Sequence, residues 1–250
     1  MAVSEQQVQS ALKELIDPNT KKDFVATKSA KNIKIDGDNV TLDIVLSYPA
    51  KSQLAGIKAM VEDKLKSIGA ASATANVTFK VVSHSVQKGV KMVPGVKNII
   101  AVASGKGGVG KSTTAANLAL ALAAEGAVVA MLDADIYGPS QPMMLGITGR
   151  PESADGKTME PMMGHGLQAM SIGFMIDPDT PMVWRGPMVT QALEQLLNDT
   201  NWKNVDYLVV DMPPGTGDVQ LTLARRVAVK IGESAVDHTS KFPNIVIQNT

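Results

Sequence analysis

A glycine-rich loop between a strand and a helix constrains this chain more than any other feature of its sequence. Residues 105–112 read GKGGVGKS, which matches the pattern G-x-x-x-x-G-K-[ST] at every fixed position. An apolar run of strand length, 98–104, precedes the loop, and Ala/Leu-rich sequence of helical composition follows it through residue 124. Strand, glycine loop and helix in this order are the context that a phosphate-binding loop requires. The sequence therefore predicts an α/β domain with a parallel sheet and a phosphate site.

The loop positions each have a chemical reason. Glycines let backbone N–H groups turn inward around phosphate oxygens without a side-chain clash, and the following helix presents its positive end to the same anion. We expect Lys111 to reach the β- and γ-phosphates of ATP and the Ser112 hydroxyl to bind Mg²⁺. The predicted nucleotide-binding residues of the loop are Gly105, Lys106, Gly107, Gly108, Val109, Gly110, Lys111, Ser112 and Thr113.

A second apolar strand, 128–132, leads into two acidic residues, Asp133 and Asp135. Acids at the carboxyl end of such a strand point into the ligand crevice of the sheet. We expect Asp135 to be catalytic, positioning the attacking water or a Mg²⁺-bound water, while Asp133 lies nearer the strand and supports it. The alternative is a strand-terminal turn with solvated acids.

A third strand, 207–210, ends in Asp211 and is typical of a Walker B element, whose acid holds Mg²⁺ through water. The predicted metal-binding residues are thus Ser112 and Asp211. The segment PPGTGD follows at 213–218, and we expect the backbone N–H of Gly215 to lie near the γ-phosphate. Loss of that contact after hydrolysis would release the segment, as in a switch loop.

A small α+β domain is predicted ahead of the phosphate loop. We place this domain at 1–90, a linker at 91–97, and the parallel-sheet P-loop NTPase domain at 98–250. No catalytic constellation appears in the first domain. Its apolar periodicity predicts a helix over 8–16 that stops at Asp17-Pro18, a hairpin over 33–46, a helix over 54–68 and a strand over 77–81.

Composition excludes several classes of function. The formal net charge is zero, whereas a dedicated nucleic-acid binder carries a basic excess. The sequence contains no cysteine, so it offers no disulfide, no Cys-ligated zinc and no thiolate ligand for an iron–sulfur cluster. The longest apolar run, 115–124, is too short to span a bilayer, and the N-terminus lacks a secretory signal. We expect a cytoplasmic protein with neither nucleic-acid nor membrane partners.

Taken together, the motifs resemble the Mrp/ApbC-type iron–sulfur cluster carrier ATPases over roughly residues 5–227. The resemblance rests on the phosphate loop, on DADIYGPSQP at 133–142, on DMPPGTGD at 211–218, on WRGPM at 184–188 and on the N-terminal domain. It implies a homodimer that binds ATP and Mg²⁺, hydrolyses ATP slowly, and carries a bridging [4Fe–4S] cluster between assembly scaffold proteins and apoproteins. Lys106 resembles the early lysine of deviant phosphate loops, which implies a catalytic role across the dimer interface.

The sequence departs from that family after about residue 227. The family's cluster ligands are a Cys-x-x-Cys pair in the C-terminal part, and here no residue is available as an iron–sulfur ligand. We interpret the end as a premature stop or frameshift with C-terminal units missing or replaced, which makes the carrier defective as written. The Walker B strand or a neighbour is then expected to be an unprotected edge, the ATPase half to be marginally stable, and the N-terminal domain to fold alone.

Two other functions remain open at this point. One is a nucleotide-switched positioning ATPase of the Min/Par type, against which the N-terminal domain and the DADIYGPS sequence argue. The other is a non-enzymatic interaction module that uses only the N-terminal domain.

Overall fold

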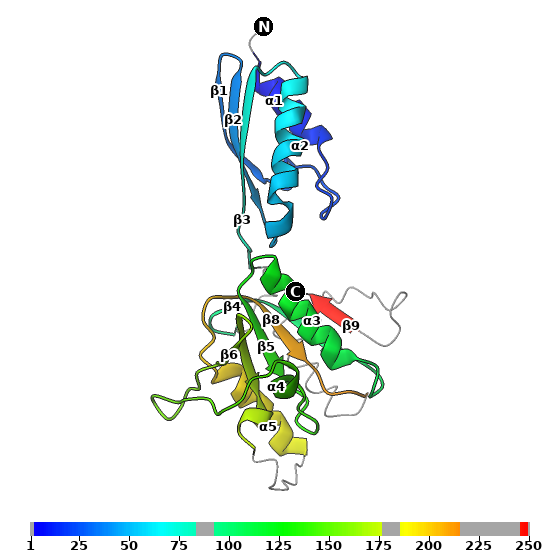
Figure 1. Cartoon of the computed structure of the whole chain (residues 1–250), viewed down its shortest axis with the longest axis vertical. Helices are drawn as coiled ribbons and strands as arrows, with labels where there is room; N and C mark the ends of the chain where they lie inside the picture. The colour runs from blue at the N-terminus through cyan, green and yellow to red at the C-terminus, as the bar shows by residue number, and fades with distance from the viewer. Residues whose placement is uncertain (1–2, 84–92, 177–185, 216–245, 250) are drawn as a thin grey trace. The chain divides into compact units, whose positions relative to one another are not determined.

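The computed structural model describes residues 3–83, 93–176, 186–215 and 246–249. The chain divides into two compact units, Met1–Val82 and Ser83–Thr250, each with its own hydrophobic core (Figure 1). None of the helices in these described ranges has the length and apolar character of a membrane span. The boundary at 82/83 precedes the predicted domain end at 90, and residues 84–92 lie outside the described ranges.

In the first unit, two helices cover one face of a three-stranded sheet (Figure 1). β1 and β2 form the predicted antiparallel hairpin, and β3 runs parallel to β2 after the α2 crossover. The elements are α1 (Glu5–Glu14), β1 (Ala30–Asp36), β2 (Asn39–Leu46), a 3₁₀ turn (Lys51–Gln53), α2 (Leu54–Ser67) and β3 (Ser72–Phe79).

The first helix begins three residues earlier and ends two residues earlier than the predicted span 8–16. It begins with a capping box between Ser4 and Gln7 and ends at Glu14, whereas Ile16 is half exposed. The reason is the turn at Asp17, whose buried carboxylate accepts hydrogen bonds from the backbone N–H of Asn19 (2.8 Å) and the hydroxyl of Tyr48 (2.8 and 2.9 Å). These bonds hold the chain in a loop that a helix cannot continue through.

The second unit is built on a six-stranded sheet in the order β6-β7-β5-β8-β4-β9. The inner four strands are parallel, whereas β6 and β9 pair antiparallel at the edges, which confirms the predicted α/β class. The strands are β4 (Val96–Ala103), β5 (Val129–Asp133), β6 (Met162–Gly164), β7 (Leu167–Ser171), β8 (Val205–Asp211) and β9 (Val246–Asn249). The other elements are α3 (Lys111–Ala124), α4 (Gln141–Met144), a 3₁₀ turn (Ile172–Phe174) and α5 (Gly186–Asn198).

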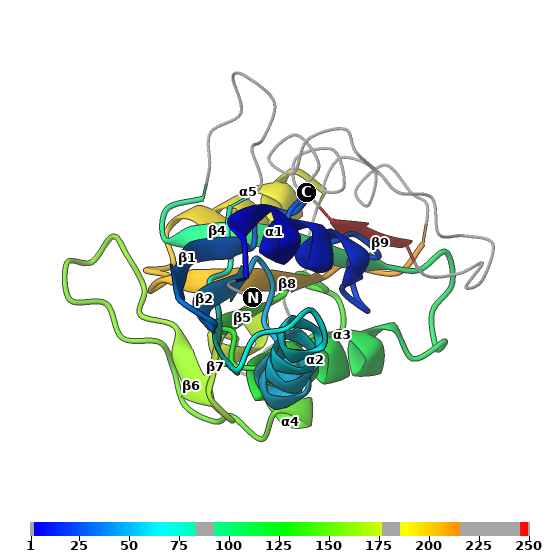
Figure 2. The same ribbon diagram turned by 90° about the horizontal axis from the view of Figure 1, so that it is seen from above.

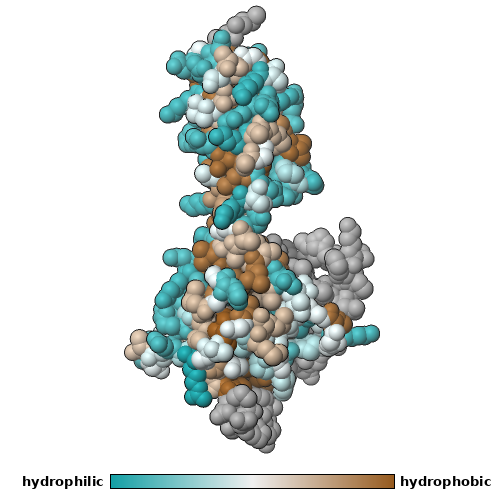
Figure 3. All heavy atoms as spheres, viewed as in Figure 1, coloured by the Kyte–Doolittle hydropathy of each residue, from teal (hydrophilic) through white to brown (hydrophobic). Residues whose placement is uncertain are grey.

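Helices α3 and α5 lie on opposite faces of this sheet (Figure 2). The inner strands are therefore buried on both sides, and every residue of β8 is buried. Apolar side chains also occur among polar ones on the visible surface of each unit (Figure 3), and Met143 and Met163 are among the most exposed. Because β4 and β5 both pair parallel to β8, the carboxyl ends of these three strands lie side by side.

The predicted linker at 91–97 is wrong for its described part. Val93 and Val96 are buried in the core of the second unit, and β4 begins at Val96 rather than at residue 98. Gly95 has φ +76°, its carbonyl accepts the N–H of Val205 at 2.7 Å, and a Cβ there would lie 2.1 Å from the carbonyl oxygen of Trp202. Pro94 and Gly95 thus belong to the turn that leads into β4 and are not part of a linker between domains.

The expected bare sheet edge is also not what the structure shows. The Walker B strand β8 is interior, between β5 and β4. The outer side of β4 pairs with β9 through four residue pairs, from Ile100↔Asn249 to Ala103↔Val246. An antiparallel strand can pair with the outer side of a parallel sheet because its hydrogen bonds need only the backbone of β4.

Candidate nucleotide-binding site

The glycine-rich loop joins β4 to α3 and borders a cavity. Gly108 and Gly110 have φ of 73° and 83°, a left-handed conformation that favours glycine, and Gly110 is the N-cap residue directly before α3. The cavity holds about 220 Å³, which suits the phosphate end of a nucleotide better than a whole one. Its lining residues are Ser104, Lys106, Gly107, Gly108, Gly110, Lys111, Ser112, Thr113, Asp135, Ser140, Met144 and Pro214.

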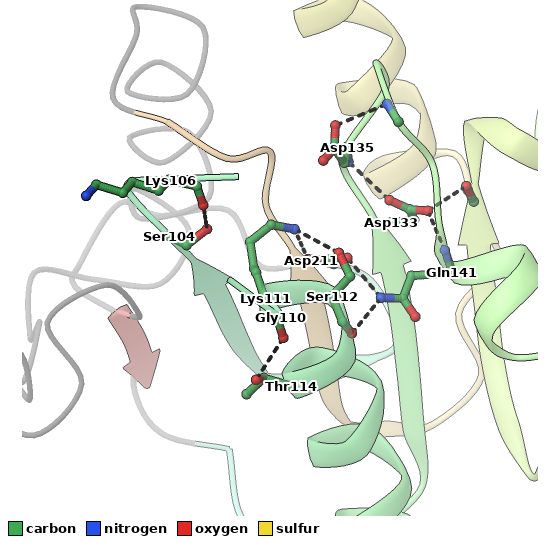
Figure 4. Close-up of polar contacts among 12 residues, drawn as sticks. Ser104, Lys106, Gly110, Lys111, Ser112, Thr114, Asp133, Asp135, Gln141 and Asp211 are labelled. Carbon is green, nitrogen blue, oxygen red and sulfur yellow. Dashed lines mark hydrogen bonds and ion pairs between the residues drawn. The ribbon is translucent and has the colours of Figure 1, made fainter. Parts of the chain in front are cut away.

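Most of the predicted loop residues therefore meet at one cavity. Gly105 and Val109 are exposed and, within the described part of the chain, are not among the lining residues. Lys106 lines the cavity, but its ammonium points away from Lys111 and Asp211 (Figure 4). Its carbonyl accepts the hydroxyl of Ser104 at 2.9 Å, which holds the start of the loop. The role of Lys106 across a dimer interface stays a prediction.

Lys111 and Asp211, predicted to bind phosphate and Mg²⁺, form an ion pair with each other (Figure 4). Lys111 is only 6% exposed and Asp211 is fully buried, and the Lys111 ammonium also donates to the Ser112 hydroxyl at 3.2 Å. A buried charge without a partner is costly, so each of these residues stabilises the other. The pair brings together the loop and the Walker B strand, which lie 100 residues apart in sequence.

Gln141 completes this cluster and was not predicted. Its Nε2 donates to Oδ2 of Asp211 at 2.8 Å and to the main-chain oxygen of Ser112 at 3.1 Å. The only signal in the sequence was its place within 133–142, directly after the strand-terminal acids. Spacing alone does not distinguish such a glutamine from any other loop residue.

Asp133 fixes the loop that carries Gln141. Its buried carboxylate accepts hydrogen bonds from the backbone N–H of Gln141 (3.0 Å), the Ser171 hydroxyl (3.1 Å) and the backbone N–H of Asp135 (3.2 Å). Burial raises the pKa of Asp133 to about 6, and the nearby Asp211 adds to that rise, against the opposing effect of the hydrogen bonds. Asp133 therefore holds the loop that carries Gln141, and among the described residues it is not one of those that line the cavity.

Asp135 lines the cavity and is half-buried. Burial raises its pKa, while the positive charge of Lys111 acts in the opposite direction. One of its oxygens accepts the backbone N–H of Gly138 at 3.3 Å, which orients the carboxylate (Figure 4). Its position allows the predicted role of orienting a water at the phosphates.

Gly215 reaches the loop in a different way from the one predicted. Its backbone N–H donates to the carbonyl of Ser104 at 2.9 Å, and its φ is 105°. The N–H must leave Ser104 before it can contact a γ-phosphate. The segment that follows the Walker B strand is thus attached to the start of the phosphate loop.

The donor set fits Mg²⁺. The Ser112 hydroxyl and the Asp211 carboxylate are oxygen groups that could hold the ion, and the buried Ser140 Oγ and Gln141 Oε1 have no hydrogen-bond partner among the described residues. No group of three or more His, Cys, Asp or Glu residues suited to a metal occurs in the described ranges. Mg²⁺ does not need such a group, because it is held by one or two protein oxygens together with substrate phosphates and waters.

A strand–loop–helix phosphate site at the carboxyl edge of a parallel sheet defines a P-loop nucleotide-binding protein. The sequence model of the family described as NUBPL iron-transfer P-loop NTPase matches residues 95–239, and this chain belongs to that family. A second model, described as iron–sulfur cluster assembly protein, matches residues 5–79.

Two curated relatives agree with this assignment. The iron–sulfur cluster carrier protein of Haemophilus influenzae is 45% identical over 91% of this chain and 62% of its own length. The iron–sulfur cluster transfer protein NUBPL of Mus musculus is 52% identical over 56% of this chain and 44% of its own length. A nucleotide-binding protein from Archaeoglobus fulgidus, solved with ADP, matches with a TM-score of 0.46 and 37% identity, over 54% of this chain and 51% of that one. The chain spans about three fifths of the length of the bacterial relative.

Proposed function

We propose that this chain binds ATP with Mg²⁺ at the 105–113 loop and hydrolyses it as the nucleotide-dependent part of iron–sulfur cluster transfer to apoproteins. The observation that carries the proposal is the meeting of Lys111, Ser112 and Asp211 beside the cavity, in a chain of the iron-transfer NTPase family. The match of residues 5–79 to a cluster-assembly family supports the same process.

The ion pair suggests how the site responds to nucleotide. Lys111 would exchange its contact with Asp211 for the β- and γ-phosphates, and the Asp211 carboxylate would then be free to hold Mg²⁺ through water. Bound Mg²⁺ supplies positive charge that offsets the phosphate oxygens. Asp135 orients the attacking water by accepting one of its protons in a hydrogen bond. The exchange of partners avoids leaving either buried charge alone.

The cluster enters the proposal as cargo rather than as a resident group. The 250 residues contain no cysteine, so they offer no thiolate to a [4Fe–4S] cluster. We place the chain in the cytoplasm as a homodimer in which Lys106 contacts the partner's nucleotide, working with scaffold proteins and client apoproteins. The names of the relatives, iron–sulfur cluster carrier and transfer proteins, support this reading.

A thermal melt with and without Mg²⁺-ATP tests the nucleotide half. At 100 times its dissociation constant, ATP is expected to stabilise the folded chain by about 2.7 kcal/mol. Lys111→Ala is expected to lose that stabilisation, measured against the melt of the same variant without nucleotide. Its own stability falls as well, because Asp211 is left buried without its counter-charge.

The matched control is Lys97→Ala, which removes a lysine from the more exposed ion pair with Asp206. Such a pair contributes about 1 kcal/mol or less, and Lys97→Ala should keep the full shift with ATP. A shift that survives in Lys111→Ala, or no shift in the parent chain, contradicts the assignment of the nucleotide site.

A further inference from the structure

Gln141 lies where the phosphate loop, the Walker B acid and the strand-terminal Asp133 meet (Figure 4). Its side chain donates to Asp211 and to the main chain of Ser112, and its backbone N–H donates to Asp133. It is only 1% exposed, so these bonds form away from water. Hydrogen bonds to ionised acceptors in such surroundings are strong and orient the acceptor.

The two oxygens of Asp211 have different partners. Oδ1 is paired with the Lys111 ammonium, and Oδ2 accepts the Gln141 amide at 2.8 Å. When Lys111 turns to the phosphates, Gln141 remains on Oδ2 and the carboxylate cannot rotate freely. Oδ1 is then the oxygen left facing the cavity side of the cluster.

Two buried oxygens beside this contact have unused bonding capacity. Gln141 Oε1 and Ser140 Oγ have no hydrogen-bond partner among the described residues, and Ser140 lines the cavity. A buried acceptor without a donor is unfavourable, so these atoms point to a donor that the bound state supplies. The waters that Mg²⁺ retains when bound to protein are such donors.

We propose that Gln141 is a positioning residue for the Mg²⁺ end of the site: it holds Asp211 by Oδ2, leaves Oδ1 to hold the metal through a water, and presents Oε1 to the same water shell. The inference rests on the proposed nucleotide site and deepens it by naming the residue that sets its metal dependence. It also connects Asp211 to the loop that carries Asp135, because the Gln141 backbone is bonded to Asp133.

The test measures the dissociation constant of ATP for the full chain with Mg²⁺ and with EDTA. Gln141→Met keeps a side chain of similar length and volume but removes the amide. We expect the gain in affinity that Mg²⁺ gives to fall by about tenfold or more, since a hydrogen bond to a charged group is lost. The affinity in EDTA should change much less, because the residues that contact the phosphates are not substituted and the loop loses only the hydrogen bond from Gln141 to the Ser112 main chain.

The chain offers a matched control in Gln168, a buried glutamine on strand β7 of the same unit. Among the described residues its side chain bonds the backbone of Lys203 alone, accepting its N–H and donating to its carbonyl, both at 2.8 Å. Gln168→Met loses a comparable pair of buried hydrogen bonds away from the cavity. It should therefore keep the full effect of Mg²⁺, which separates positioning from a general loss of stability.

The outcomes distinguish this inference from the proposed function. If the parent chain binds no ATP, the proposed function fails; if it gains affinity with Mg²⁺ and Gln141→Met gains as much, the inference is overturned. Where Gln141→Met does not bind ATP in EDTA, Gln141→Asn takes its place, because it stays polar but is one methylene too short to reach Asp211 and Ser112 together. An Asn variant with the full effect of Mg²⁺ also overturns the inference.

Discussion

At the scale of single residues, the site is held by partners that local sequence does not pair. Lys111, Gln141 and Asp211 come from three segments, and their polar atoms meet in a volume that excludes water. Each residue type was expected or unremarkable in the sequence. Their arrangement divides the work: Lys111 balances the charge of Asp211, and Gln141 orients it.

Asp133 yields a pH prediction at the same scale. Because burial raises its pKa from 3.8 to about 6, the folded chain holds this proton more tightly than the unfolded chain does. The contribution of Asp133 to the free energy of unfolding therefore falls as pH rises from about 4 through 6. Above that range this contribution stays constant at its lower value. A shift of this size corresponds to a change on the order of 3 kcal/mol.

Urea unfolding of the parent chain and Asp133→Asn at pH 4 and pH 7 checks this prediction. Asn does not titrate, so its stability relative to the parent should improve between the two pH values. The comparison is between the changes in unfolding free energy from pH 4 to pH 7 in the two proteins. The loss of stability from altering the hydrogen bonds of Gln141 and Ser171 is the same at both pH values and cancels. A difference between parent and variant that is the same at both pH values contradicts the raised pKa.

At the scale of elements, the turn into β4 needs glycine at position 95, because the backbone of Trp202 leaves no space for a side chain. Gly95→Ala is expected to destabilise the second unit by about 2 kcal/mol or more, since the residue has φ +76° and its Cβ would lie 2.1 Å from the Trp202 carbonyl oxygen. Thermal or urea unfolding of the full chain measures this loss of stability. The transition that ATP shifts is assigned to the second unit.

Gly146→Ala provides the comparison within the same unit. Gly146 also has a positive φ, +60°, but no atom lies within 4 Å of the position of an added Cβ. Its substitution carries only the cost of the left-handed backbone, about 1–2 kcal/mol. Equal effects of the two substitutions would mean that the close approach to Trp202 does not contribute.

At the scale of the whole molecule, the two units have separate cores. The first unit buries Val8, Leu12, Phe24, Leu42, Ile44, Leu46, Val61 and Leu65 almost completely. A fragment of residues 1–82 is therefore expected to fold alone and to unfold cooperatively, as many domains of this size do. The sequence also predicted that the first domain folds alone, but with its end at residue 90 instead of 82.

Circular dichroism of fragment 1–82 during urea unfolding measures that transition. Leu42→Ala should shift it by about 2–5 kcal/mol, because Leu42 is fully buried at the centre of the sheet. A broad transition that Leu42→Ala leaves unchanged would show that the fragment needs the rest of the chain.

Local sequence determined the phosphate loop, the acids that end β5 and β8, the hairpin and the helix over 54–67, because each is a spacing pattern within a short window. Only the tertiary structure decided which of these segments meet. The strand order placed Gln141 on Asp211, 70 residues away, pinned Gly95 against Trp202, and paired β9 with the outer side of β4. The physical reason is that a strand buried on both faces must be apolar, which local sequence reveals. Which strand lies beside it depends on backbone hydrogen bonds, which many different sequences can form.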